Sequence, residues 1–64
     1  MRIDRVKLVM ELTKRDMTQK ELAELSGVSR ATIGYIKAGK SCNNDVGCRI
    51  SEALEIPLEE LLEN

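Results

Sequence analysis

Apolar side chains recur along this chain with the spacing of helices. Aliphatic residues return every three or four positions, which gathers them on one face of a helix with 3.6 residues per turn. No window alternates apolar and polar residues in the manner of a half-buried strand. The pattern therefore predicts an all-α fold, with helical segments at about residues 3–15, 18–26, 29–38, 43–54 and from 57 onward.

The second predicted helix has the clearest boundaries. Thr18 is followed three residues later by Glu21, a spacing that forms a capping box, in which each side chain accepts a hydrogen bond from the other residue's backbone N–H. Gly27 suits the left-handed conformation that commonly ends a helix. The residues that we expect this helix to bury are Leu22, Ala23 and Leu25.

The third predicted helix follows after a turn of about three residues. Ser29 should cap its start, and it should end near Ala38, just before Gly39. Its inward-facing residues should be Val28, Ile33 and Ile36. Two short helices joined in this way form a helix-turn-helix, in which the second helix projects sideways and can enter a groove of DNA.

The first predicted helix carries two overlapping apolar stripes. One stripe consists of Leu8, Val9 and Leu12, and the other of Ile3, Val6 and Met10. The pattern alone does not decide which stripe faces the core. If the second stripe is exposed, it marks a surface for a partner protein.

Two further helices are predicted in the C-terminal third. Asn43 or Asn44 should cap the fourth helix, and the small residues Gly47 and Cys48 should let it lie close to a neighbour. Its buried residues should be Ile50, Ala53 and Leu54. Pro57 suits the first position of the fifth helix. The apolar face of that helix should be Leu58, Leu61 and Leu62.

The composition fits one small domain over residues 1–64, and we expect a cytoplasmic protein without a cofactor. The chain has two cysteines and no histidine, whereas a structural zinc site needs four ligands. We therefore expect Cys42 and Cys48 to be reduced thiols. Neither a signal peptide nor the roughly 18 apolar residues of a membrane span is present. No phosphate-binding loop and no nucleophile–base spacing indicates an enzyme.

The charge is distributed unevenly along the chain, although the formal net charge is only −1. Residues 1–40 hold nine Lys or Arg against five Asp or Glu, a net charge of +4. Residues 41–64 hold one against six, a net charge of −5. The basic portion can attract phosphate while the acidic end faces away.

The segment Gln19–Ile36 resembles the helix-turn-helix of the Cro/CI-repressor-like (Xre-type) family. The match lies in the Gln-Lys-Glu-Leu-Ala start, the small Ala23, the turn at Gly27 and the apolar Val28, Ile33 and Ile36. The preceding Met-Thr-Gln, the later Gly-Lys and the Ile-Ser-Glu-Ala-Leu of the fourth helix also resemble the family. The resemblance implies a compact five-helix lambda-repressor-like DNA-binding domain with its helix-turn-helix unit at about residues 18–38. It also favours Leu8 and Leu12 as the core side of the first helix.

The resemblance also implies which residues meet DNA. The base-contacting positions would be Arg30, Ala31, Gly34 and Tyr35. The positions contacting the DNA backbone would be Thr18, Gln19, Ser29, Thr32, Lys37, Lys40, Ser41 and Asn43. Arg30 can pair with guanine O6 and N7 through two hydrogen bonds. Gly34 lies inside the third predicted helix, where glycine is unfavourable. It either permits close approach to DNA or is a tolerated weak position.

These features together predict a sequence-specific double-stranded DNA-binding protein, a transcriptional repressor that reads the major groove with helix 29–38. We expect a weak homodimer, completed on an inverted-repeat operator, with Leu58, Leu61 and Leu62 at its contact surface. The alternative is an antitoxin or anti-repressor, in which the same fold binds a partner protein.

Overall fold

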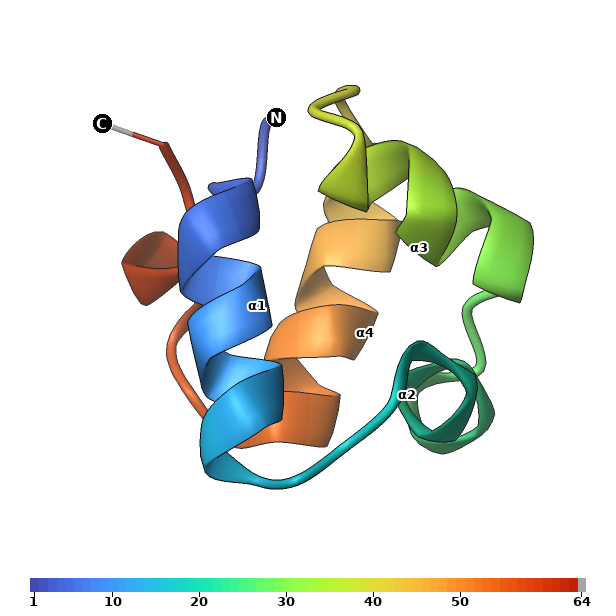
Figure 1. Ribbon diagram of the computed structural model, residues 1–64. Helices are drawn as coiled ribbons and strands as arrows, with labels where there is room; N and C mark the ends of the chain where they lie inside the picture. The colour runs from blue at the N-terminus through green and yellow to red at the C-terminus, as the bar shows by residue number, and fades with distance from the viewer. Residues whose placement is uncertain (64) are drawn as a thin grey trace.

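The computed structural model describes residues 1–63, in which four α-helices are followed by a short 3-10 turn (Figure 1). The elements are α1 (Arg5–Lys14), α2 (Gln19–Ser26), α3 (Arg30–Lys37), α4 (Asn44–Leu54) and η1 (Leu58–Glu60). The all-α prediction is confirmed. No helix within residues 1–63 is long and apolar enough to cross a membrane.

Side-chain caps begin all four α-helices. The capping box of Thr18 and Glu21 is present with both of its hydrogen bonds, and Ser29 and Asn43 cap α3 and α4 as predicted. The cap of α1 is Asp4, whose Oδ1 accepts hydrogen bonds from the N–H groups of residues 6 and 7. The first helix therefore begins two residues later than the predicted 3–15.

The prediction of a fifth α-helix is wrong. The segment after Pro57 makes only the three-residue turn η1, and Pro57 precedes that turn in an extended conformation. So short a segment cannot repay the cost of nucleating an α-helix. The chain instead continues so that Leu62 forms an isolated antiparallel bridge with Ile3.

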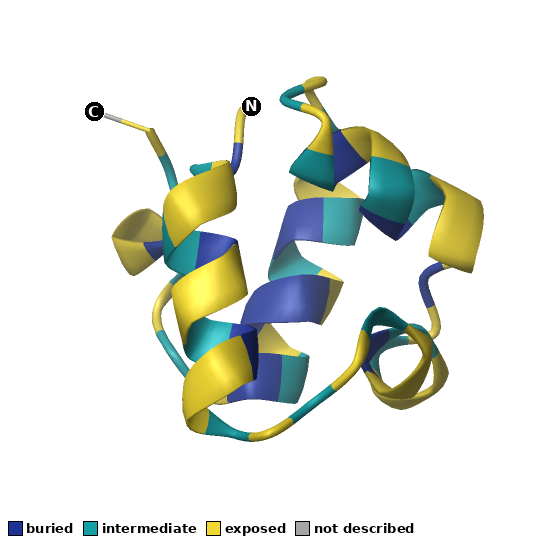
Figure 2. Cartoon of the chain, viewed as in Figure 1, coloured by how far each residue is buried: buried dark blue, intermediate teal, exposed yellow. Residues whose placement is uncertain are grey.

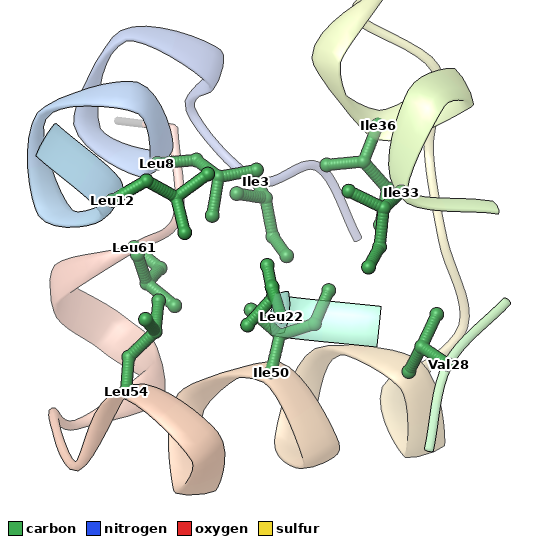
Figure 3. Close-up of a cluster of buried hydrophobic side chains, with 10 residues drawn as sticks. All are labelled: Ile3, Leu8, Leu12, Leu22, Val28, Ile33, Ile36, Ile50, Leu54 and Leu61. Carbon is green, nitrogen blue, oxygen red and sulfur yellow. The ribbon is translucent and has the colours of Figure 1, made fainter. Parts of the chain in front are cut away.

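The core is a single cluster of apolar side chains contributed by every helix (Figure 3). Its buried members are Ile3, Leu8, Leu12, Leu22, Val28, Ile33, Ile36, Ile50, Leu54 and Leu61. Ala23 and Ala53 are partly buried and pack against this cluster. One predicted core residue is wrong, because Leu25 is 61% exposed.

The two apolar stripes of the first predicted helix are buried to different extents. Leu8 and Leu12 face the core, as the family resemblance favours. Ile3 is also buried, but it lies before α1. Val6 and Met10 are 61% and 57% exposed, so together with Val9 they leave an apolar surface on α1.

Leu61, one of the three leucines expected at a dimer surface, is not available to a second copy. Leu61 is completely buried in the core of its own chain, and Leu62 packs partly buried against that core. The backbone between Ile3 and Leu62 is paired, and Asp4 N donates to Leu61 O at 2.7 Å. Residues 61–63 therefore close the core beside the start of the chain.

Gly47 allows the close approach that its size predicts. It is buried, and a Cβ atom at this position would lie 2.6 Å from Met1 Sδ and 3.3 Å from Leu58 Cδ1. Met1 is held nearby because its backbone exchanges hydrogen bonds with Cys42, at 2.8 Å and 3.0 Å. The start of the chain thus packs against both α4 and the loop that precedes it.

Candidate nucleic-acid interface

The turn between α2 and α3 fixes the direction in which α3 projects. Gly27 adopts a left-handed φ of +74°, and its N–H donates to Ala23 O at 2.9 Å. Val28 N donates to Ser26 Oγ at 3.2 Å, and the Val28 side chain is only 6% exposed. The turn is therefore anchored by glycine geometry, a side-chain hydrogen bond and a core residue.

Helix α3 is divided into an inner and an outer face. Ile33 and Ile36 are buried on the inner face. The four predicted base-contacting residues lie on the other side: Arg30, Ala31 and Tyr35 are exposed and Gly34 is half-buried. Figure 2 shows the first turn of α3 exposed at the edge of the molecule. The outer face is thus open to solvent.

The chemistry of this outer face suits a base edge. Four ion pairs are formed within residues 1–63, and the Arg30 guanidinium is in none of them. Its five N–H donors are therefore not held by a carboxylate of residues 1–63. Tyr35 is 56% exposed, and Lys40 Nζ lies 5.2 Å from the centre of its ring. The ring and the ammonium group stand together at the end of α3.

Two hydroxyls near the starts of α2 and α3 retain a proton that can be donated. Thr18 Oγ1 accepts from Glu21 N at 3.1 Å. Ser29 Oγ accepts from Thr32 N and donates to Thr32 Oγ1 at 2.8 Å. Because a hydroxyl carries one donor and two acceptor sites, Thr18 and Thr32 can still donate their own protons to a phosphate oxygen.

The loop from Gly39 to Asn43 lies against the end of α3. Gly39 has a left-handed φ of +94°, and Lys40 N donates to Tyr35 O at 3.0 Å. Lys40, Ser41 and Asn43 are all exposed. Asn43 uses its Oδ1 to cap α4, at 2.8 Å from Val46 N, which leaves its amide N–H groups available. Of the predicted backbone-contacting residues of this loop, Lys40 therefore lies next to Tyr35.

The comparisons with known proteins identify the family. The family model described as "Helix-turn-helix" matches residues 6–61. The chain belongs to this helix-turn-helix family, of the Cro/CI (Xre) type. Membership implies that it binds DNA. No curated protein matches.

One solved structure has the fold of this helix-turn-helix domain. It is titled "Phpd with cadmium complexed with hydroethylphosphonate (HEP)" and superposes with a TM-score of 0.85 over 100% of this chain. The sequence identity is 23%, and the domain spans 14% of that chain. The similarity therefore supports the fold alone.

The start of α2 in this helix-turn-helix domain adjoins α1 and the end of α3. Thr18, Gln19 and Lys37 line one hollow together with Val9, Thr13 and Met17. Gln19 and Lys37 are half-buried, so their stems pack in the hollow. The capping box lowers the pKa of Glu21, mainly through the hydrogen bond from the Thr18 backbone, which keeps this helix start intact at neutral pH.

The two cysteines are free thiols. Burial raises the pKa of Cys42, so its thiol stays protonated at neutral pH. One residue beside the loop after α3 was not foreseen: Arg2 Nη2 donates to Gly39 O. No local sequence pattern could have indicated this contact, because it joins residues 37 positions apart.

Proposed function

We propose that this chain is a sequence-specific double-stranded DNA-binding repressor that reads the major groove with α3. The observation that carries the proposal is the outer face of α3, where Arg30, Ala31, Gly34 and Tyr35 are turned away from the core. An α-helix fits the major groove, where each base pair presents its own pattern of donors and acceptors. A face of this kind on a helix-turn-helix is placed to read that pattern.

Each residue of the outer face has a chemical role in this proposal. Arg30 pairs with guanine O6 and N7 by two parallel hydrogen bonds. Ala31 offers a methyl group to thymine, and Tyr35 reaches a base edge or a thymine methyl about one turn further along. Gly34 lets the backbone of α3 come close to the bases.

Phosphate contacts then fix the register of α3 in the groove. The residues that we assign to them are Thr18, Gln19, Ser29, Thr32, Lys37, Lys40, Ser41 and Asn43. They lie at the start of α2, at both ends of α3 and on the following loop. Contacts to phosphate carry affinity but no sequence information, whereas the base contacts carry the choice of site.

Two substitutions separate these roles. Arg30→Ala should cost about 1–3 kcal/mol of binding free energy and relax the preference at one base position. Lys40→Ala should weaken binding to all sequences alike and lower the slope of log K against log salt by about one. Selection of preferred sites from a random DNA pool with each variant measures both effects. An unchanged site preference after Arg30→Ala would refute the assignment of Arg30 as a base-reading residue.

A second candidate function is supported by the apolar surface on α1. Val6, Val9 and Met10 are exposed there, and Arg5 and Lys37 line the same hollow. In an antitoxin or anti-repressor, this surface would hold a partner protein. Because Lys37 is also assigned to phosphate, such a partner would compete with DNA. Retention on heparin discriminates: a module that binds only protein should flow through at its net charge of −1.

A further inference from the structure

Arg2 lies at the edge of the proposed DNA interface although it is far from the helix-turn-helix in the sequence. Its Nη2 donates to Gly39 O, and Met1 next to it exchanges two backbone hydrogen bonds with Cys42. Figure 1 shows the start of the chain beside the loop that follows α3. Arg2 is therefore held against Gly39, the residue that precedes Lys40, and Lys40 is one of the residues assigned to phosphate.

The Arg2 guanidinium keeps most of its donors free. A guanidinium has five N–H groups in a planar fork, and the hydrogen bond to Gly39 O engages the Nη2 end. The side chain is 59% exposed. Its free edge can therefore bind a phosphate through two hydrogen bonds, the geometry in which Arg is preferred to Lys.

A carboxylate already occupies part of this space. Glu63 Oε1 lies 3.7 Å from Arg2 Nε, and Glu63 N donates to Arg2 O at 3.0 Å. The two side chains are 59% and 44% exposed, and ion pairs this exposed to water contribute little stability. A DNA phosphate can therefore displace the Glu63 carboxylate from the Arg2 guanidinium.

We propose that Arg2 contacts a DNA phosphate beside the one bound by Lys40, and that Glu63 competes with the phosphate for Arg2. This inference rests on the proposed DNA-binding function. It extends the interface from residues 18–43 to the segment before α1, with Gly39 O as the group that orients the guanidinium. The acidic C-terminal part of the chain then lowers the affinity for DNA through the Glu63 carboxylate.

The first test compares Arg2→Ala with Lys14→Ala, a control that removes the same charge at the opposite end of α1. The full chain is titrated with a duplex of about 20 base pairs and mixed sequence at several salt concentrations. Each phosphate contact contributes about −0.9 to the slope of log K against log salt. Arg2→Ala should reduce the slope by that amount, so its affinity deficit should shrink about threefold to fourfold from about 50 to 200 mM salt. Lys14→Ala should leave the slope unchanged.

The second test leaves Arg2 in place. Glu63→Gln should raise the affinity for DNA, by no more than the factor by which Arg2→Ala lowers it. Glu59→Gln, which makes the same change of charge, should leave the affinity unchanged. If Arg2 only caps α3, Arg2→Ala lowers the melting temperature but keeps the slope, which overturns the proposal. Equal affinities for the two glutamine variants would overturn the competition. If the unaltered chain fails to bind the duplex at low salt, the proposed function itself fails, and this inference with it.

Discussion

At the scale of single residues, the glycines of the helix-turn-helix differ in what they contribute. Gly27 and Gly39 have positive φ angles, so the turns themselves require them. Gly34 is helical, and apart from its chain neighbours and the backbone of α3 itself, no heavy atom of residues 1–63 lies within 4 Å of the position where a Cβ would stand. The fold therefore gives no reason for glycine at this position of α3, which favours a role in the approach to DNA.

Gly34→Ala should make the protein more stable and a weaker DNA binder. The added methyl group removes the entropic cost of glycine in a helix, about 1 kcal/mol, which corresponds to a melting temperature about 4–8 °C higher. The same methyl group would stand between α3 and the bases. Thermal unfolding and DNA titration of the same variant measure both effects. A stabilised variant with unchanged affinity would show Gly34 to be only a tolerated weak position.

The sequence allows a residue to be assigned when its partners are close to it along the chain. The family resemblance assigns Arg30 and Tyr35 to the bases, and the structure exposes both residues on α3, whereas Ile33 and Ile36 are buried. Their contact with DNA stays a prediction. Arg2 was not foreseen, because its partner Gly39 is brought near only by tertiary structure.

At the scale of elements, the sequence predicted the starts of α2, α3 and α4, but not that of α1, and it predicted the buried faces of the helices only in part. The capping residues Thr18, Ser29 and Asn43 act on N–H groups three residues away, so their spacing is visible in the chain. Leu25 lies at the end of α2 and fits a helical stripe, yet no neighbouring element covers it. The last segment has the composition of a helix, but Leu61 is drawn into the core after a single 3-10 turn.

Leu61 and Leu25 provide a matched pair for testing this account of the elements. Leu61→Ala empties a fully buried position and should lower the free energy of unfolding by about 2–5 kcal/mol, which is comparable to the whole stability of so small a domain. Leu25→Ala removes an exposed side chain and should change that free energy by less than about 0.5 kcal/mol. Urea denaturation followed by circular dichroism measures both. Similar losses of unfolding free energy in the two variants would contradict the buried position of Leu61 and the exposed position of Leu25.

At the scale of the whole molecule, one reading helix is too small to select a site in a genome. A helix of this kind contacts about four base pairs, and many competing sites would match. Two copies related by a two-fold axis would double the number of base pairs read. Because the C-terminal leucines are used inside each chain, we expect the two copies to pair weakly in solution and to meet on DNA.

Sedimentation with and without a selected duplex tests this assembly. The free protein should be a monomer, and two chains should bind each duplex, on half-sites about 10 base pairs apart in an inverted repeat. One chain per duplex at saturation, on a site without inverted symmetry, would contradict the dimer.

We expect the helix-turn-helix, which lies within the basic residues 1–40, to bind the phosphate backbone of duplex DNA, although the formal net charge of the molecule is −1. The most direct measurement is the affinity for a selected duplex as a function of salt concentration. With about four to six phosphate contacts, the slope of log K against log salt should be about −3.6 to −5.4, so affinity should fall by roughly two to three orders of magnitude between about 50 and 200 mM. A flat salt response, or no binding at the lowest salt concentration, would contradict the account.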